Sequence, residues 1–332
     1  MGERIRLGHG SGGVLSRKLV EEAFLPFLGN PVLEALGDSG VFRLGERRLA
    51  LTTDSFVVKP PFFPGGNIGK LSASGTINDL AVSGARPLFI TGGFVLEEGL
   101  DIDDLTRIAS SFAETIKEVE AAFVAGDTKV IEGSGGIIVN TAGLGEVLPQ
   151  LNLSPERIEP EDRIIVTGTV GDHGFAVILA RGELGLSADF PSDCAPLWGL
   201  LEPLYAELGP DIKFVRDPTR GGLATVLNEV CGPGLDFLIN EQDVPVRPEV
   251  AAASELLGLD PLYSACEGRA VIFVSPDSAD KALEILKGHP LGKGSAVIGE
   301  VTEGKGLVVG ITETGGRRVL DMLAEDQYPR IC

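Results

Sequence analysis

The sequence predicts a mixed α/β (α+β) protein with two domains and a short C-terminal tail. Strand-like apolar runs and helical stretches alternate irregularly between many glycine turns, which favours a mixed arrangement over a simple parallel sheet. The 332 residues are too many for one small core. A polar stretch at 150–161, rich in proline, separates the halves. We therefore expect domains at 1–150 and 151–322, with a tail at 323–332.

The N-terminal half opens on a loop at 8–13 that contains too many glycines for a regular element. The helix expected at 101–122 has the clearest pattern, because its apolar residues recur at i+3 and i+4 after an acidic start. A helix of small residues is expected within 69–85. The other elements expected in this half are a helix at 16–27, a hairpin of strands 41–44 and 48–53, a strand at 123–125 running into a turn at 126–129, and a strand at 137–141.

The C-terminal half repeats this style, with strands and helices between glycine turns. A helix is expected directly after Gly221 and Gly222. The other expected helices lie at 175–180, 197–208 and 279–287, and the expected strands at 164–167, 214–215, 270–274, 296–298 and 307–311.

Composition narrows the class of partner. Net charge is −20, so nucleic acid and anionic membranes are poor partners, and a nucleotide would need Mg²⁺ as a mediator. Neither a signal peptide nor an 18-residue apolar run is present. The four cysteines lack CxxC spacing, which indicates a reducing cytoplasm and no zinc site.

An acidic residue recurs beside strand ends and glycine turns. Singly, each is best explained as a turn former. Jointly, the four in the N-terminal half can converge on a hard cation such as Mg²⁺, which prefers oxygen ligands. These four candidate ligands are Asp38, Asp54, Asp79 and Asp127.

The glycine loops offer open backbone N–H groups for phosphate oxygens. The usual phosphate loop is absent, since Gly69-Lys70 and Gly292-Lys293 both fail its pattern, so any ATP site has another design. Lys129 and Glu267 are candidate acid–base residues, although for each residue taken alone a surface ion pair is the preferred explanation.

The tail ends at Cys332, which puts a thiol at the end of a tether. Pro329 favours an extended tail, and from Leu323 onward it reaches roughly 30 Å at about 3.3 Å per residue. Most such tails are frayed and have no function. The remaining motifs decide how this one is interpreted.

Seven motifs, taken together and in order, resemble the HypE family of hydrogenase maturation proteins. They span the whole chain, and the terminal cysteine is the most specific of them, because related ATPases lack it. The motifs are His9-Gly10-Ser11-Gly12-Gly13, Thr53-Asp54-Ser55-Phe56, Gly75-Thr76-Ile77-Asn78-Asp79-Leu80-Ala81, Ala125-Gly126-Asp127-Thr128-Lys129-Val130, Gly168-Thr169-Val170-Gly171-Asp172-His173-Gly174, Arg216-Asp217-Pro218-Thr219-Arg220-Gly221-Gly222 and Pro329-Arg330-Ile331-Cys332.

The resemblance implies an aminoimidazole ribonucleotide synthetase-like fold that binds Mg-ATP in a cleft and dimerises through its N-terminal domain. It implies that the carbamoyltransferase HypF loads a carbamoyl group onto the sulfur of Cys332. ATP-dependent dehydration then gives a thiocyanate, whose cyanide passes to iron on a HypC–HypD complex for nickel–iron hydrogenase.

The resemblance also implies roles for individual residues. The four aspartates above are candidate Mg²⁺ ligands, and Lys129 and Glu267 are candidates for binding or deprotonating the carboxamide. Asp217 either adds a ligand or orients Arg220. The residues expected at the nucleotide are His9, Gly10, Ser11, Gly12, Gly13, Asn78, Asp217, Thr219, Arg220, Gly221 and Gly222.

Two other functions compete with this one. A synthetase or kinase of the same superfamily would act on a free small molecule, although selenophosphate synthesis is disfavoured because no cysteine precedes Cys194. A scaffold would use the tail thiol only to dock or cross-link partners, with no use of ATP. Replacement of Cys332 by alanine distinguishes the first alternative, because a small-molecule enzyme would keep product formation. Measurement of ATP consumption distinguishes the second, because a scaffold would consume none.

Overall fold

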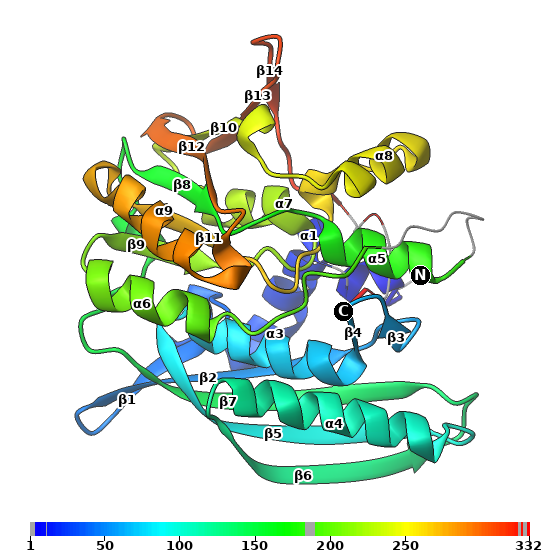
Figure 1. Ribbon diagram of the computed structural model, residues 1–332. Helices are drawn as coiled ribbons and strands as arrows, with labels where there is room; N and C mark the ends of the chain where they lie inside the picture. Colours follow the sequence, from blue (N-terminus) through cyan, green and yellow to red (C-terminus); the bar gives the residue numbers. More distant parts are fainter. Residues whose placement is uncertain (1–3, 11, 183–189, 325–326, 328–330) are drawn as a thin grey trace.

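The computed structural model describes residues 4–10, 12–182, 190–324, 327 and 331–332. Within these residues two large sheets lie on either side of a layer that contains helices α3 (Ile68–Val82) and α6 (Trp198–Leu208) (Figure 1). The main core cluster has members from both sheets and from both helices, so the two halves share apolar packing. This confirms the expected mixed α/β class.

The N-terminal sheet has five strands in the described residues, in the order β1-β2-β7-β5-β6. Only β5 and β6 run parallel, and the other neighbours are antiparallel. The expected hairpin is confirmed as β1 and β2. The strand bounds are β1 (Gly40–Leu44), β2 (Arg47–Phe56), β5 (Ala85–Glu97), β6 (Ala122–Ile131) and β7 (Ile137–Val147).

Helices α3 and α4 (Ile102–Glu118) contact each other closely at one point, and both were expected from the sequence. Helix α3 begins where the side chain of Asn67 accepts hydrogen bonds from two backbone N–H groups of its first turn. A Cβ added at Gly69 would lie 2.0 Å from the carbonyl oxygen of Ile108 in α4, so this contact requires glycine. The small residues of α3 therefore reflect a helix packed on several sides.

The C-terminal sheet has seven strands in the described chain, in the order β14-β13-β10-β12-β8-β11-β9, and only β10 and β13 run parallel. The strands are β8 (Arg163–Val166), β9 (Ile212–Arg216), β10 (Leu235–Asn240), β11 (Val271–Val274), β12 (Ala296–Glu303), β13 (Leu307–Ile311) and β14 (Arg317–Val319). The other helices of this half are α5 (Asp172–Ala180), α7 (Gly222–Val230), α8 (Pro248–Leu257) and α9 (Ala279–Gly288).

The single helix expected at 16–27 is wrong in detail. The segment is divided into α1 (Gly13–Leu19), a π-helical turn (Val20–Phe24) and α2 (Leu25–Leu28). Pro26 lies in this stretch and has no N–H to donate, which interrupts the α-helical hydrogen bonds. The apolar side chain of Phe27 is 85% exposed.

The turn expected at 126–129 is also wrong. These residues lie inside β6, where Gly126 and Asp127 pair with Gly92 and Gly93 of β5. Strands β5, β10 and β14 and helix α8 were not expected at all.

Short elements complete the described chain. A two-stranded ribbon joins β3 (Phe62–Phe63) and β4 (Gly66–Asn67). The 3-10 turns are Leu7–Gly10, Leu33–Ala35, Pro155–Arg157, Glu241–Asp243, Pro261–Tyr263, Pro276–Ser278 and Pro290–Gly292. In the part of the chain that the structure describes, no helix is both long and apolar enough to cross a membrane.

Candidate active site between the two halves

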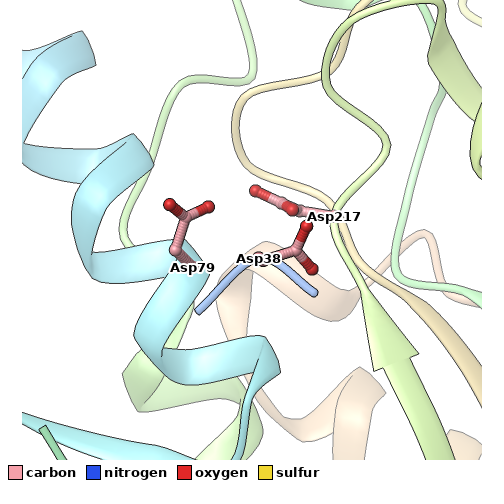
Figure 2. A group of neighbouring side chains, drawn as sticks. All are labelled: Asp38, Asp79 and Asp217. Carbon is pink, nitrogen blue, oxygen red and sulfur yellow. The ribbon is translucent and has the colours of Figure 1, made fainter. Parts of the chain in front are cut away.

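Three aspartates from distant segments converge between the halves. Asp38 precedes β1, Asp79 lies in the last turn of α3, and Asp217 directly follows β9 (Figure 2). One carboxylate oxygen from each lies within 4.8 Å of the others. Such a set of hard oxygen donors suits a divalent cation such as Mg²⁺.

The electrostatics of this cluster favour binding of a positive charge. Burial, and then the charge of Asp38, raise the pKa of Asp217 from 3.8 to about 8. Burial, and then Asp217, raise the pKa of Asp79 well above its usual value. Among the described residues, the buried Oδ2 atom of Asp217 has no hydrogen-bond partner. A bound cation would compensate the charge and satisfy this oxygen, so the residues fit Mg²⁺.

Neighbouring side chains fix the cluster in place. The Oγ1 atom of Thr52 donates to Oδ2 of Asp79 over 2.6 Å. The guanidinium of Arg216 lies 3.2 Å from Asp38 and 3.0 Å from Glu229, and thereby ties the N-terminal half to the C-terminal half. The sequence indicated no role for Thr52, which directly precedes the motif beginning at Thr53. It also indicated none for Arg216, which is the first residue of the motif at 216–222.

Arg220 lies beside the cluster and contacts the first glycine loop. It donates to the carbonyl oxygen of Gly10 over 3.2 Å, and its guanidinium lies 3.8 Å from Asp54. Gly12 has a φ of +87°, and a Cβ there would lie 2.9 Å from the Cβ of Arg220. The glycine loop, Arg220 and Asp54 are therefore brought together as one wall of the site.

The second glycine loop leads into α7. Gly221 caps this helix with a φ of +73°, and a Cβ there would lie 2.3 Å from the hydroxyl of Thr225. The N–H group of Gly222 donates to the carbonyl oxygen of Thr219 over 2.9 Å. The loop thus places the N-terminus of α7 a few residues after Asp217, and a helix N-terminus is a suitable binding site for an anion.

The remaining residues of the first loop have other contacts. His9 accepts a hydrogen bond at Nδ1 from the N–H of Arg6 over 3.0 Å. Gly13 has a φ of +75° and lies against the carbonyl of Leu323, where the tail begins. Ser11 lies outside the described residues, so its predicted contact with the nucleotide stays a prediction.

Glu267 is 2% exposed and lies among the same charged groups. Burial, and then the charges of Asp217, Asp193 and Asp54, raise its pKa well above the usual value, while Arg220 lowers it. A carboxylate in such surroundings binds a proton more strongly than one in water. Of the two acid–base candidates, Glu267 lies at the acid cluster.

Asn78 holds Glu267 from the side of α3. Its amide nitrogen donates to the carbonyl oxygens of Ala195 and Glu267, each over 3.2 Å, and its oxygen accepts from the N–H of Leu197 over 2.8 Å. Both amide hydrogens are therefore used on the backbone. The predicted contact between Asn78 and a cofactor stays a prediction.

The last residue of the chain reaches this site. Cys332 is half-buried and packs against the main core cluster. The negative charge at Cys332 is the largest influence on the pKa of Arg220 and raises it, followed among the charges by Asp54 and Glu267. The charged end of the tail therefore acts on Arg220, the residue that contacts Gly10 and lies 3.8 Å from Asp54.

Asp127 and Lys129 do not join the site within one chain. They lie on β6, whose ten residues are all exposed, and form an exposed ion pair of 3.7 Å with each other. Asp54 and Gly126 share one row across the sheet, three strand spacings apart. At about 4.8 Å per spacing this amounts to roughly 14 Å. The assignments of these two residues stay predictions.

Comparison with known proteins places the chain in a class first. Residues 36–147 match the model of the AIR synthase related protein N-terminal domain, and residues 159–312 match that of the C-terminal domain. Thiamine monophosphate kinase shares the fold at 17% identity with a TM-score of 0.66. The protein is therefore a two-domain AIR synthase-related protein.

The closer matches are to one branch of that class. The chain is 43% identical to the carbamoyl dehydratase HypE of Rhizobium leguminosarum bv. viciae, covering 99% of this chain and 95% of the relative. It is 42% identical to that of Escherichia coli K12, covering 99% of each. The chain belongs to the carbamoyl dehydratase HypE family.

Solved structures of HypE proteins also match this chain closely. The crystal structure of a HypE–HypF complex matches with a TM-score of 0.86 at 44% identity, covering 92% of this chain and 99% of the other. The structure of HypE in complex with ATP matches with a TM-score of 0.82 at 42% identity, covering 98% and 99%.

Proposed function

We propose that this protein uses ATP to dehydrate a carboxamide on the sulfur of Cys332 to a thiocyanate, which supplies cyanide for the iron of nickel–iron hydrogenase. One observation carries the proposal: the charge at Cys332 is the largest influence on the pKa of Arg220, which contacts Gly10 of the glycine loop and lies 3.8 Å from Asp54. A chain that acts on its own tail needs such a position. Membership of the carbamoyl dehydratase family supports the reaction class.

The chemistry explains why ATP is needed. An amide oxygen is a poor leaving group, and its phosphorylation turns it into a good one. The carbon–oxygen bond then breaks, both nitrogen protons leave, and carbon and nitrogen form the nitrile. The carboxamide oxygen departs in inorganic phosphate, ATP becomes ADP, and no oxidant or reductant is needed. The protein must hold the two reactants in line and remove protons.

The acid cluster and the glycine loops divide the task of holding ATP. Asp38, Asp79 and Asp217 would hold Mg²⁺. Asp54 would help to orient Arg220, whose guanidinium lies 3.8 Å from it. When bound, Mg²⁺ neutralises phosphate charge. The loop of Gly10 to Gly13 and the N-terminus of α7 offer backbone N–H groups to the phosphates.

Glu267 is the base that we propose for the carboxamide nitrogen. It is buried, its pKa is raised by burial, and Arg220 lies beside it. Once ionised it accepts a proton more readily than a solvated carboxylate. The backbone bonds from Asn78 hold it in position.

We propose a homodimer in which β6 is the contact strand. β6 lies at the edge of its sheet and exposes apolar side chains, including Val124 at 53% and Val130 at 69%. An exposed, apolar edge strand favours pairing with another chain. Asp127 and Lys129 would then act at the site of the partner copy, which agrees with their distance from the acid cluster of their own chain.

We propose HypF as the partner that loads the carbamoyl group and a HypC–HypD complex as the acceptor of cyanide. The relative crystallised as a HypE–HypF complex supports the first of these. None of the four cysteines forms a disulfide in the described residues, which is consistent with a cytoplasmic site of action.

ATP turnover by the carbamoylated protein tests the proposal. Chain loaded by HypF with its carbamoyl donor should consume one ATP per loaded Cys332 and release one phosphate. A scaffold would consume none. Cys332→Ala should abolish product formation, whereas an enzyme acting on a free small molecule would keep it. The proposal would be overturned if the loaded chain consumed no ATP, or if Cys332→Ala still formed product.

A further inference from the structure

Ile331, the residue before Cys332, is buried as completely as a core residue. The side chain of Ile331 is 3% exposed and belongs to the core cluster shared by both halves. The last residues of a chain are usually frayed unless specific contacts hold them. The contacts of Ile331 therefore bear on where Cys332 lies.

One of these contacts is a hydrogen bond to a buried histidine. His173 lies in the first turn of α5 and is 0% exposed. Its Nε2 atom lies 2.9 Å from the carbonyl oxygen of Ile331, and its Nδ1 atom lies 2.8 Å from the hydroxyl of Ser192. The ring of Phe63 meets the imidazole edge-on at 5.3 Å, which restricts rotation of the ring.

These partners determine which nitrogen carries the proton. A carbonyl oxygen only accepts, so Nε2 must carry the hydrogen that reaches Ile331. Nδ1 then accepts from the hydroxyl of Ser192, whose oxygen in turn accepts from the N–H of Cys194 over 3.0 Å. Burial lowers the pKa of His173 to about 4, so the ring is neutral at pH 7.

The position of the bond matters for the sulfur. The carbonyl of Ile331 belongs to the planar peptide group that joins it to Cys332. Once this group is fixed, only φ and χ1 of Cys332 remain free between the peptide plane and the sulfur, and χ1 has three staggered positions. A bond at this one carbonyl therefore restricts the sulfur to a few places beside Arg220.

We propose that His173 is a positioning residue that latches the tail, with its Nε2–H bond to the Ile331 carbonyl holding Cys332 at the reaction site. The proposal deepens the proposed function and rests on it. Loading of the carbamoyl group and release of cyanide require the tail to leave the site. Its departure breaks this bond and leaves the buried Nε2–H donor of His173 without its partner. The latch therefore favours the docked state without any contact to the reacting atoms.

The test compares His173→Phe, which keeps a ring but removes both hydrogen bonds, with His173→Gln, whose terminal amide can donate in place of Nε2. The first measurement is the rate at which iodoacetamide alkylates Cys332, followed by mass spectrometry of the C-terminal peptide so that other cysteines do not contribute. The loss of one hydrogen bond should accelerate alkylation roughly tenfold in His173→Phe. His173→Gln should restore most of the protection.

The second measurement is single-turnover dehydration of the loaded chain at saturating ATP. His173→Phe should be slowed roughly tenfold with unchanged ATP affinity, because the latch acts on the tail rather than on the nucleotide. His289→Phe is the matched control, since His289 caps a 3-10 turn in the C-terminal half, and it should match the wild type.

If His173→Phe does not fold, His173→Leu replaces it. Its apolar side chain also offers no donor to the carbonyl oxygen of Ile331, so Cys332 should again be alkylated faster. A folded variant with wild-type alkylation would overturn the latch. Failure of the wild type to dehydrate at all would instead overturn the proposed function, and the alkylation result would still decide the latch.

Discussion

Replacement of Asp217 by asparagine should stabilise the metal-free protein and abolish Mg²⁺-dependent ATP binding. Asp217 is 4% exposed, and one oxygen each of Asp38, Asp79 and Asp217 lies within 4.8 Å of the others. Two ionised carboxylates at that distance repel by about 3 kcal/mol at an effective dielectric constant of 20. The side-chain amide of the Asp217→Asn variant would offer N–H donors to the two remaining carboxylates, which turns this repulsion into hydrogen bonding.

The pH dependence gives the sign of the effect. The pKa of Asp217 is 3.8 in the unfolded chain and about 8 in the folded chain. A group with a raised folded pKa contributes stability that is full below its unfolded pKa and is lost as pH rises through its folded pKa. The wild type should therefore lose about 1.4 kcal/mol per pH unit from this group between roughly pH 4 and pH 8.

Urea unfolding in EDTA at pH 5, 6, 7 and 8 measures the difference. The advantage of Asp217→Asn should grow by about 3 kcal/mol from pH 5 to pH 7. In parallel titrations without EDTA, Mg-ATP should stabilise the wild type and leave the variant unchanged. The exposed Asp277→Asn serves as the control and should follow the wild type. A difference that is flat with pH, or a variant still stabilised by Mg-ATP, would refute the reasoning.

Three further changes test separate parts of the site. Glu267→Gln should lower the single-turnover dehydration rate at least 100-fold while ATP binding by calorimetry is retained, because general-base catalysis contributes about that much; wild-type turnover would exclude Glu267 as the base. An alanine appended after the half-buried Cys332 should slow dehydration, because Cys332 must fit into a closed cleft; full activity would show that the cleft admits a longer tail. Val130→Asp on β6 should convert dimers to monomers in light scattering, whereas Leu256→Asp on α8 should not; unchanged mass for both would reject β6 as the interface.

Much of the fold follows from local pattern. The small-residue helix α3 and the amphipathic helix α4 were predicted within a few residues of their bounds. The turn at 126–129 was wrong, because glycine and aspartate signal turns locally while pairing of β6 with β5 decides the outcome. Asp127 was grouped with the other acids on the strength of that turn, and its position on the edge strand separates it from them within one chain.

The site depends on contacts that no local pattern contains. Asp38 and Asp79 were grouped in advance, and Asp217 was named either as a further ligand or as the residue that orients Arg220. Asp217 comes from the other half and joins the two only because the halves pack together. His173 stood in a quoted motif without a role, since its partner is the carbonyl of Ile331 at the far end of the chain. Sequence identified the kinds of residue, and packing determined which ones meet.

Intact mass of the chain is the most direct test of the central claim. After incubation with HypF and its carbamoyl donor, the chain should gain one carboxamide, located on Cys332 by fragmentation. Addition of Mg-ATP should then remove the mass of one water from the same residue. A loaded chain that keeps its full carboxamide mass while ATP is present, or a loss of water at any other residue, would contradict the account.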